Sequence, residues 1–155
     1  MYRTKDFMGK DIHWQLPYKQ SGVVKDIICQ WDQGIVKGII VETGIIFNKS
    51  NLCISLDVIK RVAGEWFIVE PLDAVKVEIS GKQWSQYFNV KVVTNWGHET
   101  GYMTDILFSI PGGAIEFLEV SDGFLKDFIN GKTKIPYRYF ETITPNLIIV
   151  QSDWR

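Results

Sequence analysis

Two stretches of the sequence follow one pattern. Residues 21–44 read SGVVKDIICQWDQGIVKGIIVETG, and residues 100–123 read TGYMTDILFSIPGGAIEFLEVSDG. They align without a gap, so that Gly22 matches Gly101. The other aligned anchor pairs are Asp26 with Asp105, Gly34 with Gly113, and Gly44 with Gly123. An internal repeat of this length indicates two similar folding units in tandem.

The repeat extends to both sides of this stretch. Upstream, GKDIHW from Gly9 aligns with NVKVVT from Asn89. Downstream, ISLDVIKRVAGEWFIVE from Ile54 aligns with IPYRYFETITPNLIIVQ from Ile135. The spacing between the copies changes only between apolar runs, where loops tolerate insertions. We therefore predict a first unit at residues 1–72, a connecting segment at 73–87 and a second unit at 88–155.

Each copy consists of short runs of β-branched and aromatic residues separated by Gly, Pro, Asn and Asp. This pattern is typical of strands joined by tight turns. We predict an all-β fold of two small tandem barrels with at most short helical turns, near Leu56 and Gly123. The predicted interior or half-buried strand positions are Ile27, Val36, Ile39, Ile106, Ile115 and Leu118.

Repeated glycines and aspartates are predicted to fix the turns of the two copies. The six positions are Gly22, Asp26, Gly34, Gly101, Asp105 and Gly113. A β-carbon at Gly22 or Gly101 is expected to strain the backbone. Asp26 and Asp105 are also candidates for acid–base chemistry as repeated carboxylates. We favour the structural interpretation, because a carboxylate near a turn commonly accepts hydrogen bonds from local backbone amides.

The order of these elements resembles the PRC-barrel family. The resemblance rests on the leading strand, the Gly-x-x-x-Asp hairpin, the IPYRYF strand with its following turn, and the closing LIIV strand; Ser55 stands where the second copy has Pro136. The family includes the cytoplasmic barrel of the photosynthetic reaction-centre H subunit, the C-terminal domain of a ribosome-maturation factor, and small stand-alone bacterial proteins. The resemblance implies a barrel but no particular chemistry, because the motif residues determine fold.

The composition narrows the class of partner. The chain has 17 Lys and Arg against 18 Asp and Glu, a net charge of −1. Because binding to phosphates requires a positive surface, nucleic acid is a disfavoured partner. No run approaches the roughly 18 apolar residues of a membrane span, so we expect no membrane insertion and a cytoplasmic location. Cys29 and Cys53 lack zinc or redox spacing and are predicted to be buried thiols.

The sequence contains no recognisable catalytic constellation. GxSxG, HExxH, P-loop and GxGxxG patterns are absent. A nucleophile needs a base within hydrogen-bond reach, and the two histidines, His13 and His98, are far apart in sequence and not equivalent in the repeat. We therefore nominate no catalytic residue, no cofactor and no metal site, and we expect a protein that is not an enzyme.

Aromatic residues supply the remaining functional candidates. The chain has six Trp, six Tyr and nine Phe, and such rings often anchor interfaces. Trp14 and Tyr18, in the first loop of one copy, and Trp96, in the equivalent loop of the other, are predicted partner anchors. The alternative is that these rings close the barrel ends as lids.

The leading functional hypothesis is a non-catalytic adaptor or assembly protein that binds another protein or a second copy of itself. Small open barrels leave strand edges that must be covered or paired, which favours this interpretation. One alternative is a ribosome or RNA maturation factor. The other is a small-ligand binder with its site between the two barrels.

Overall fold

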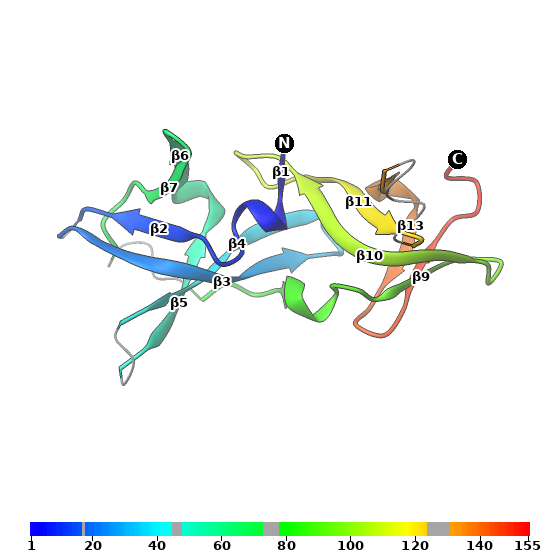
Figure 1. Ribbon diagram of the computed structural model, residues 1–155, viewed down its shortest axis with the longest axis horizontal. Helices are drawn as coiled ribbons and strands as arrows, with labels where there is room; N and C mark the ends of the chain where they lie inside the picture. Colours follow the sequence, from blue (N-terminus) through cyan, green and yellow to red (C-terminus); the bar gives the residue numbers. More distant parts are fainter. Residues whose placement is uncertain (17, 45–47, 73–77, 124–130) are drawn as a thin grey trace.

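The fold is all-β, as the sequence predicts. The computed structural model describes residues 1–16, 18–44, 48–72, 78–123 and 131–155. Within these ranges the chain forms two seven-stranded sheets. Figure 1 shows the two curled sheets side by side along the long axis of the molecule, one from each sequence repeat. We call them the first barrel and the second barrel.

The first barrel has the strand order β5-β4-β3-β2-β7-β6. Neighbouring strands are antiparallel except β2 and β7, which are parallel. The bounds are β2 Asp11–Trp14, β3 Gln20–Gln30, β4 Ile35–Thr43, β5 Ser50–Ser55, β6 Ile59–Val62 and β7 Glu65–Ile68.

The second barrel repeats this order as β12-β11-β10-β9-β14-β13, again with one parallel pair, β9 and β14. The bounds are β9 Lys91–Thr94, β10 Glu99–Phe108, β11 Ile115–Ser121, β12 Thr133–Pro136, β13 Phe140–Ile143 and β14 Ile148–Val150. The sequence repeat is therefore also a repeat of topology, and the prediction of two small tandem barrels is confirmed.

Helical structure with defined bounds is limited to short 3-10 turns in the described ranges. They are η1 Thr4–Asp6, η2 Leu56–Val58, η3 Trp84–Gln86 and η4 Tyr137–Tyr139. The turn predicted near Leu56 is η2, which passes directly into β6. The turn predicted near Gly123 falls on residues 124–130, outside the described ranges. No helix in the described part of the chain has the length and apolar character to cross a membrane.

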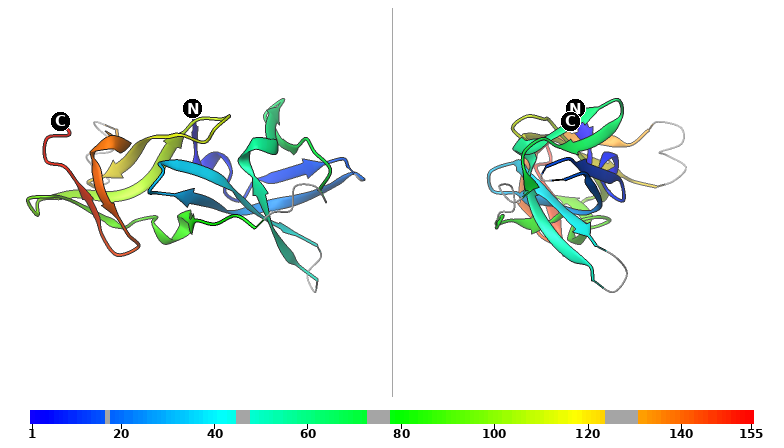
Figure 2. Two further views of the ribbon diagram at one scale, coloured as in Figure 1. Left: turned by 180° about the vertical axis from the view of Figure 1, so that it is seen from behind. Right: turned by 90° about the vertical axis from the view of Figure 1, so that its left-hand side faces the viewer.

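Two short strands cross between the barrels. β1 (Tyr2–Arg3) pairs with β10 of the second barrel, and β8 (Lys82–Gln83) pairs with β3 of the first. The turns that follow them, η1 and η3, both lie near the middle of the molecule (Figure 2). A strand from the predicted first unit therefore joins the sheet of the second barrel, and a strand from the predicted connecting segment joins that of the first. A repeat alignment matches residues between copies and does not show which sheet they join.

In the fold, each residue of the closing strand β7 corresponds to a residue of β14 one position later than the sequence alignment places it. Ile12 in β2 faces Trp66, and its equivalent Val92 in β9 faces Ile148, so Trp66 corresponds to Ile148 in the fold. A bulge between Phe140 and Thr142 in β13 takes up the additional residue. Because neighbouring residues of a strand point to opposite faces, this shift of one residue changes which side chains are buried. Trp66 and Ile148 are both buried, whereas Leu147, the sequence-aligned partner of Trp66, is 36% exposed.

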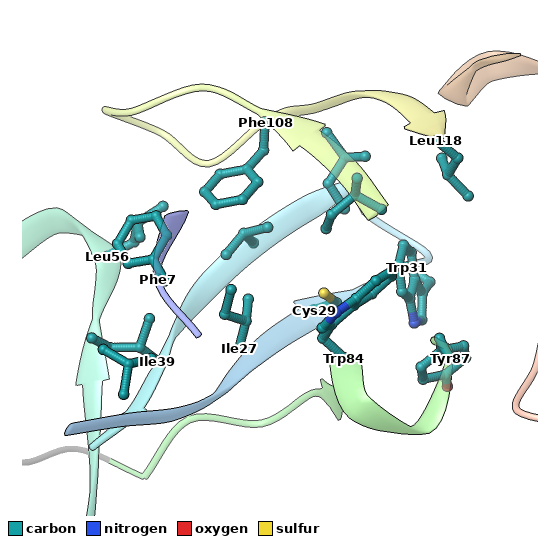
Figure 3. Packing of buried hydrophobic residues seen from close by; sticks show 14 of the residues in the cluster. Phe7, Ile27, Cys29, Trp31, Ile39, Leu56, Trp84, Tyr87, Phe108 and Leu118 are labelled. Carbon is teal, nitrogen blue, oxygen red and sulfur yellow. The ribbon is translucent and has the colours of Figure 1, made fainter. Parts of the chain in front are cut away.

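One continuous hydrophobic core fills both barrels and the junction between them. All six predicted interior positions are buried. At the junction the Phe7 ring stacks on Trp66 at 4.0 Å and on Phe108 at 5.9 Å, measured between ring centroids. Figure 3 shows Phe7 and Phe108 toward one side of the junction and Trp31 and Tyr87 toward the other. The barrels are therefore joined by shared packing as well as by the chain.

The tips of two hairpins meet at the centre of the junction. The amide of Val36 donates to the carbonyl of Gly113 at 2.7 Å, and the amide of Ile115 donates to the carbonyl of Gly34 at 2.8 Å. These bonds are equivalent under the repeat, and an isolated bridge pairs Ile35 with Ala114 between them. The junction therefore has approximate two-fold symmetry within a single chain. Gly34 and Gly113 lie in the hairpin turns, where they were predicted.

Gly22 and Gly101 lie inside strands β3 and β10, not in turns, but both positions exclude a side chain. Gly101 has φ +145°, and a β-carbon there would lie 2.2 Å from the carbonyl oxygen of Ser121. Gly22 lies outside the left-handed region, and its β-carbon would lie 2.7 Å from the carbonyl oxygen of Glu42. The predicted strain thus arises at Gly101 from both conformation and contact, and at Gly22 from contact alone.

Candidate functional site

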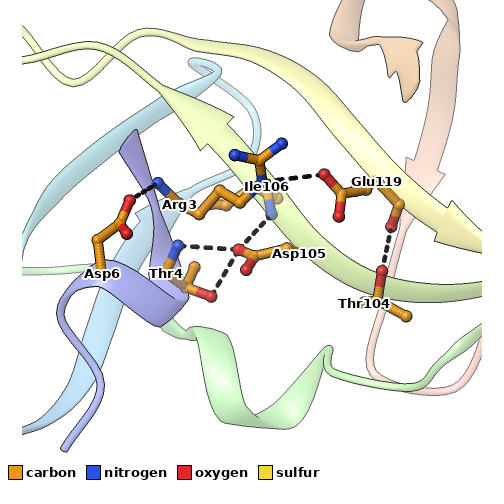
Figure 4. Close-up of polar contacts among 7 residues, drawn as sticks. All are labelled: Arg3, Thr4, Asp6, Thr104, Asp105, Ile106 and Glu119. Atoms are coloured by element: carbon orange, nitrogen blue, oxygen red, sulfur yellow. Dashed lines mark hydrogen bonds and ion pairs between the residues drawn. The ribbon is translucent and has the colours of Figure 1, made fainter. Parts of the chain in front are cut away.

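Asp26 and Asp105 fix the two crossing segments. Each lies at a β-bulge within its strand, so the predicted position in a turn is corrected to a bulge. Asp105 Oδ1 accepts hydrogen bonds from the Thr4 amide at 2.8 Å, the Thr4 hydroxyl at 2.6 Å and the Ile106 amide at 2.8 Å (Figure 4). Asp26 accepts from the amides of Ile27 at 2.8 Å and Ser85 at 3.1 Å, and from the Ser85 hydroxyl at 2.5 Å.

The two carboxylates therefore perform equivalent structural tasks. Asp105 holds η1, which arrives from the start of the chain, and Asp26 holds η3, which arrives from the connecting segment. Both are buried, and their hydrogen bonds come from backbone amides and hydroxyl groups, as the structural interpretation expects. The sequence did not reveal that Thr4 and Ser85, from segments distant in the chain, are the donors held by these aspartates.

The other candidate reactive groups show no catalytic arrangement. Cys29 is buried, and its burial, together with the charge of Asp26, raises the pKa of its thiol far above the ordinary range. His13 Nε2 lies 3.8 Å from a carboxylate oxygen of Glu65, and His98 is in an exposed loop. Among the residues that the structure describes, no group of His, Cys, Asp and Glu is placed to hold a metal ion.

The three predicted partner anchors separate into a core residue and two surface residues. Trp14 is 1% exposed, so it is a core side chain and its assignment as an anchor is wrong. Tyr18 and Trp96 are 62% and 76% exposed. The alternation in DIHW, residues 11–14, indicates that Trp14 is a core residue. Ile12 and Trp14 point to one face of β2, and both are fully buried.

An apolar groove lies at the outer end of the first barrel, away from the junction. Its volume is about 430 Å³, and the apolar side chains Leu16, Val62, Phe67 and Val69 dominate its lining. Leu16, Val62 and Val69 are exposed, in contrast to the core residues beside them. We call this surface the outer groove; its remaining lining residues are Gln15, Ile68 and Glu70. Sequence reasoning missed it because its residues come from separate strands and loops.

The outer groove adjoins a strand edge. β6 ends the strand order of the first sheet, so one side of it has no strand neighbour among the described residues. Lys60 and Arg61 on β6 are exposed, and the Arg61 guanidinium lies 5.2 Å from the centre of the Trp66 ring. The outer groove is therefore an apolar surface bordered by a basic strand with a free edge.

A second concave region, which we call the junction groove, lies between the barrels. It consists of two cavities of about 520 Å³ and 350 Å³ that share Trp31, Asp32 and Ile143. The groove has contributions from the β3–β4 hairpin tip, from the segment around β8 and from η4 and β13. Its walls are polar and aromatic, in contrast to those of the outer groove. A scan against protein-family models and a search of curated proteins both found no match to this chain.

Proposed function

We propose that this chain is a non-catalytic binding protein of the PRC-barrel type that binds an extended segment of another protein at the outer groove. The observation that carries this proposal is the combination of exposed Leu16, Val62 and Val69 with the free edge of β6. Apolar side chains gathered in one concave surface are typical of interaction sites. The two barrels with one topology support the family assignment.

The free edge of β6 favours an extended occupant. A strand edge offers unpaired backbone amide and carbonyl groups, and a peptide in extended conformation satisfies them by adding one strand to the sheet. Its alternate side chains then fall on one face, where the outer groove would accept apolar ones. Main-chain hydrogen bonds supply affinity in this mode, and the groove supplies selectivity.

The charge at this edge favours an acidic segment. Lys60 and Arg61 on β6 are both exposed, and Lys19 in the loop before β3 is also exposed. Acidic residues that alternate with apolar ones would complement this arrangement, because complementary charge raises association rates and fixes register. A second copy of this chain is the competing occupant.

Photocrosslinking in the cells that express this chain tests the proposal. A photoreactive phenylalanine analogue is placed at Val62, with the same analogue at exposed Phe88 as the matched control. We expect Val62 to crosslink to an acidic, extended segment of a different protein, identified by peptide mass spectrometry, and Leu16→Asp to remove that crosslink. Crosslinks to another copy of this chain, or the same products at Phe88, would contradict the proposal.

A further inference from the structure

The junction groove combines aromatic walls with two carboxylates. Its smaller cavity is lined by the aromatic residues Trp31, Tyr137 and Phe140 and by the acidic residues Asp32 and Glu141. Asp32 and Glu141 are exposed, and neither has an ion-pair partner in the described part of the chain. Aromatic faces and unpaired carboxylates both attract cations, the rings through their quadrupoles and the carboxylates through their charge.

The aromatic side chains are held in place by the junction itself. The Tyr137 hydroxyl donates to the backbone carbonyl of Trp31, and the Trp31 ring lies 5.1 Å from the Tyr87 ring. Trp31 is only 9% exposed. Burial, and then the negative charge of Asp32, raise the pKa of Tyr137. The walls are therefore formed before any ligand arrives.

The larger cavity adds an unused hydrogen-bond acceptor. Gln30 lines it, and its side-chain nitrogen donates to the Ser80 carbonyl at 2.8 Å. Its side-chain oxygen is buried and has no hydrogen-bond partner in the described structure. Buried acceptors are nearly always satisfied, so this oxygen calls for a donor. Lys82, the cation that lines this cavity, has no ion pair with Asp32.

The approximate two-fold symmetry provides an internal control. On the opposite side of the junction the repeat places Ile110 at the position of Trp31, Pro111 at that of Asp32 and Leu56 at that of Tyr137. The equivalent backbone positions on that side of the junction therefore carry apolar side chains. The fold does not require the aromatic and acidic set, so its presence on one side needs another explanation.

We propose that the junction groove is a binding site for an organic cation, an ammonium or guanidinium group. The cation packs against the Trp31 and Tyr137 rings and pairs with Asp32 and Glu141. Such a group arises from a free amine such as a polyamine or from a Lys or Arg side chain of another protein. This site is separate from the outer groove and does not rest on the function proposed for it.

Titration followed by nuclear magnetic resonance tests the site directly. The probes are spermidine, the peptide acetyl-Gly-Arg-Gly-amide, and the same peptide with citrulline, the uncharged analogue of arginine. We expect at least one cationic probe to cause saturable shifts of the Trp31 indole N–H and the Asp32 amide, and citrulline to cause none. Binding of spermidine alone identifies a free amine as the ligand, and binding of the arginine peptide alone identifies a protein side chain.

Isosteric variants test whether the carboxylates of Asp32 and Glu141 are required for binding of the cation. Asp32→Asn and Glu141→Gln change exposed groups and retain shape, and Asp11→Asn removes an exposed negative charge elsewhere as the matched control. We expect Asp32→Asn and Glu141→Gln each to weaken binding by about tenfold, as loss of a charge-assisted contact does. Asp11→Asn should leave it unchanged. Equal shifts with citrulline, absence of saturable shifts, or unchanged affinity in both groove variants would overturn the proposal.

Discussion

The two barrels have the same backbone topology and differ in the side chains that they carry at equivalent positions. Both have the same strand order, the same parallel pair and the same bulged aspartate that holds a crossing segment. They differ in the first loop, in the closing hairpin and on the two sides of the junction. Exposed Val69 of the first barrel, for example, corresponds to Gln151 of the second in the fold, where the closing strands are shifted by one residue relative to the sequence alignment. The shared residues define the fold, and the residues that differ are the candidates for function.

The largest expected difference between the barrels concerns two tryptophans. Trp14, in strand β2, fills the core of the first barrel, whereas Trp96 projects from the loop that follows β9 in the second. We expect Trp14→Ala to lower the free energy of unfolding by about 3 to 5 kcal/mol through loss of buried surface and cavity formation. Trp96→Ala should change it by less than about 0.5 kcal/mol. Urea denaturation monitored by circular dichroism measures both, and similar losses would contradict the assignment of Trp96 to the surface.

The bulged aspartates should give the next largest effect. Asp105→Ala leaves the Thr4 and Ile106 amides and the Thr4 hydroxyl without their acceptor, and Asp26→Ala does the same to groups of Ser85 and Ile27. We expect each variant to lose about 2 to 3 kcal/mol of unfolding free energy.

Hydrogen exchange distinguishes the two aspartates. Asp105→Ala should release residues near Thr4, so that amides in this segment and the Ile106 amide exchange faster. Asp26→Ala should affect both barrels, because η3 is continuous with the second one. Identical exchange patterns in the two variants would show that the crossing segments are held by other contacts.

Substitution of the strand glycines should cost slightly less. Gly101→Val introduces both an unfavourable φ and a contact with the Ser121 carbonyl, whereas Gly22→Val introduces only a contact with the Glu42 carbonyl. We expect a loss of about 1 to 3 kcal/mol for each, with Gly101→Val the greater. Thermal denaturation of both variants checks the order, with Gly64→Val as a control that has an unfavourable φ of +81° but no contact within 4 Å of the added β-carbon. A smaller loss at Gly101 than at Gly22 would contradict it.

The smallest effect should come from an ion pair that, among the described residues, only one of the two crossing segments has. The Arg3 guanidinium lies 3.0 Å from Glu119, and the repeat places Gln83 at the position of Arg3. Arg3→Gln therefore makes the two segments alike. Because Arg3 is partly exposed, we expect a loss of less than about 1 kcal/mol, and less still at high salt. A loss that does not depend on salt would point to packing of the Arg3 stem instead.

Sequence reasoning was most reliable where the repeat preserves a physical requirement. Ile27, Ile106 and the other interior positions are buried because strand periodicity and apolar character agree in both copies. Gly22 and Gly101 exclude a side chain as expected. Trp14 was misassigned because it was considered part of a loop, although it aligns on one face with Ile12.

The features that decide the candidate sites depend on tertiary structure. The crossing of β1 and β8 cannot be read from an alignment, since either copy could have kept its own leading strand. The junction groove brings together Trp31, Lys82 and Glu141, which are far apart in the sequence and belong to three different segments. Likewise, the closing strand of the second barrel shifts by one residue because a bulge in β13 absorbs it.

The crossing strands have a consequence for any attempt to divide the molecule. Because β1 belongs to the sheet of the second barrel and β8 to that of the first, neither half of the chain contains all the strands of one barrel. A chain cut within residues 73–77 would give two fragments, each of which carries a strand that the other lacks. Such fragments are expected to behave as a split-protein pair that folds on mixing, with the interlocked strands serving as the recognition element between them.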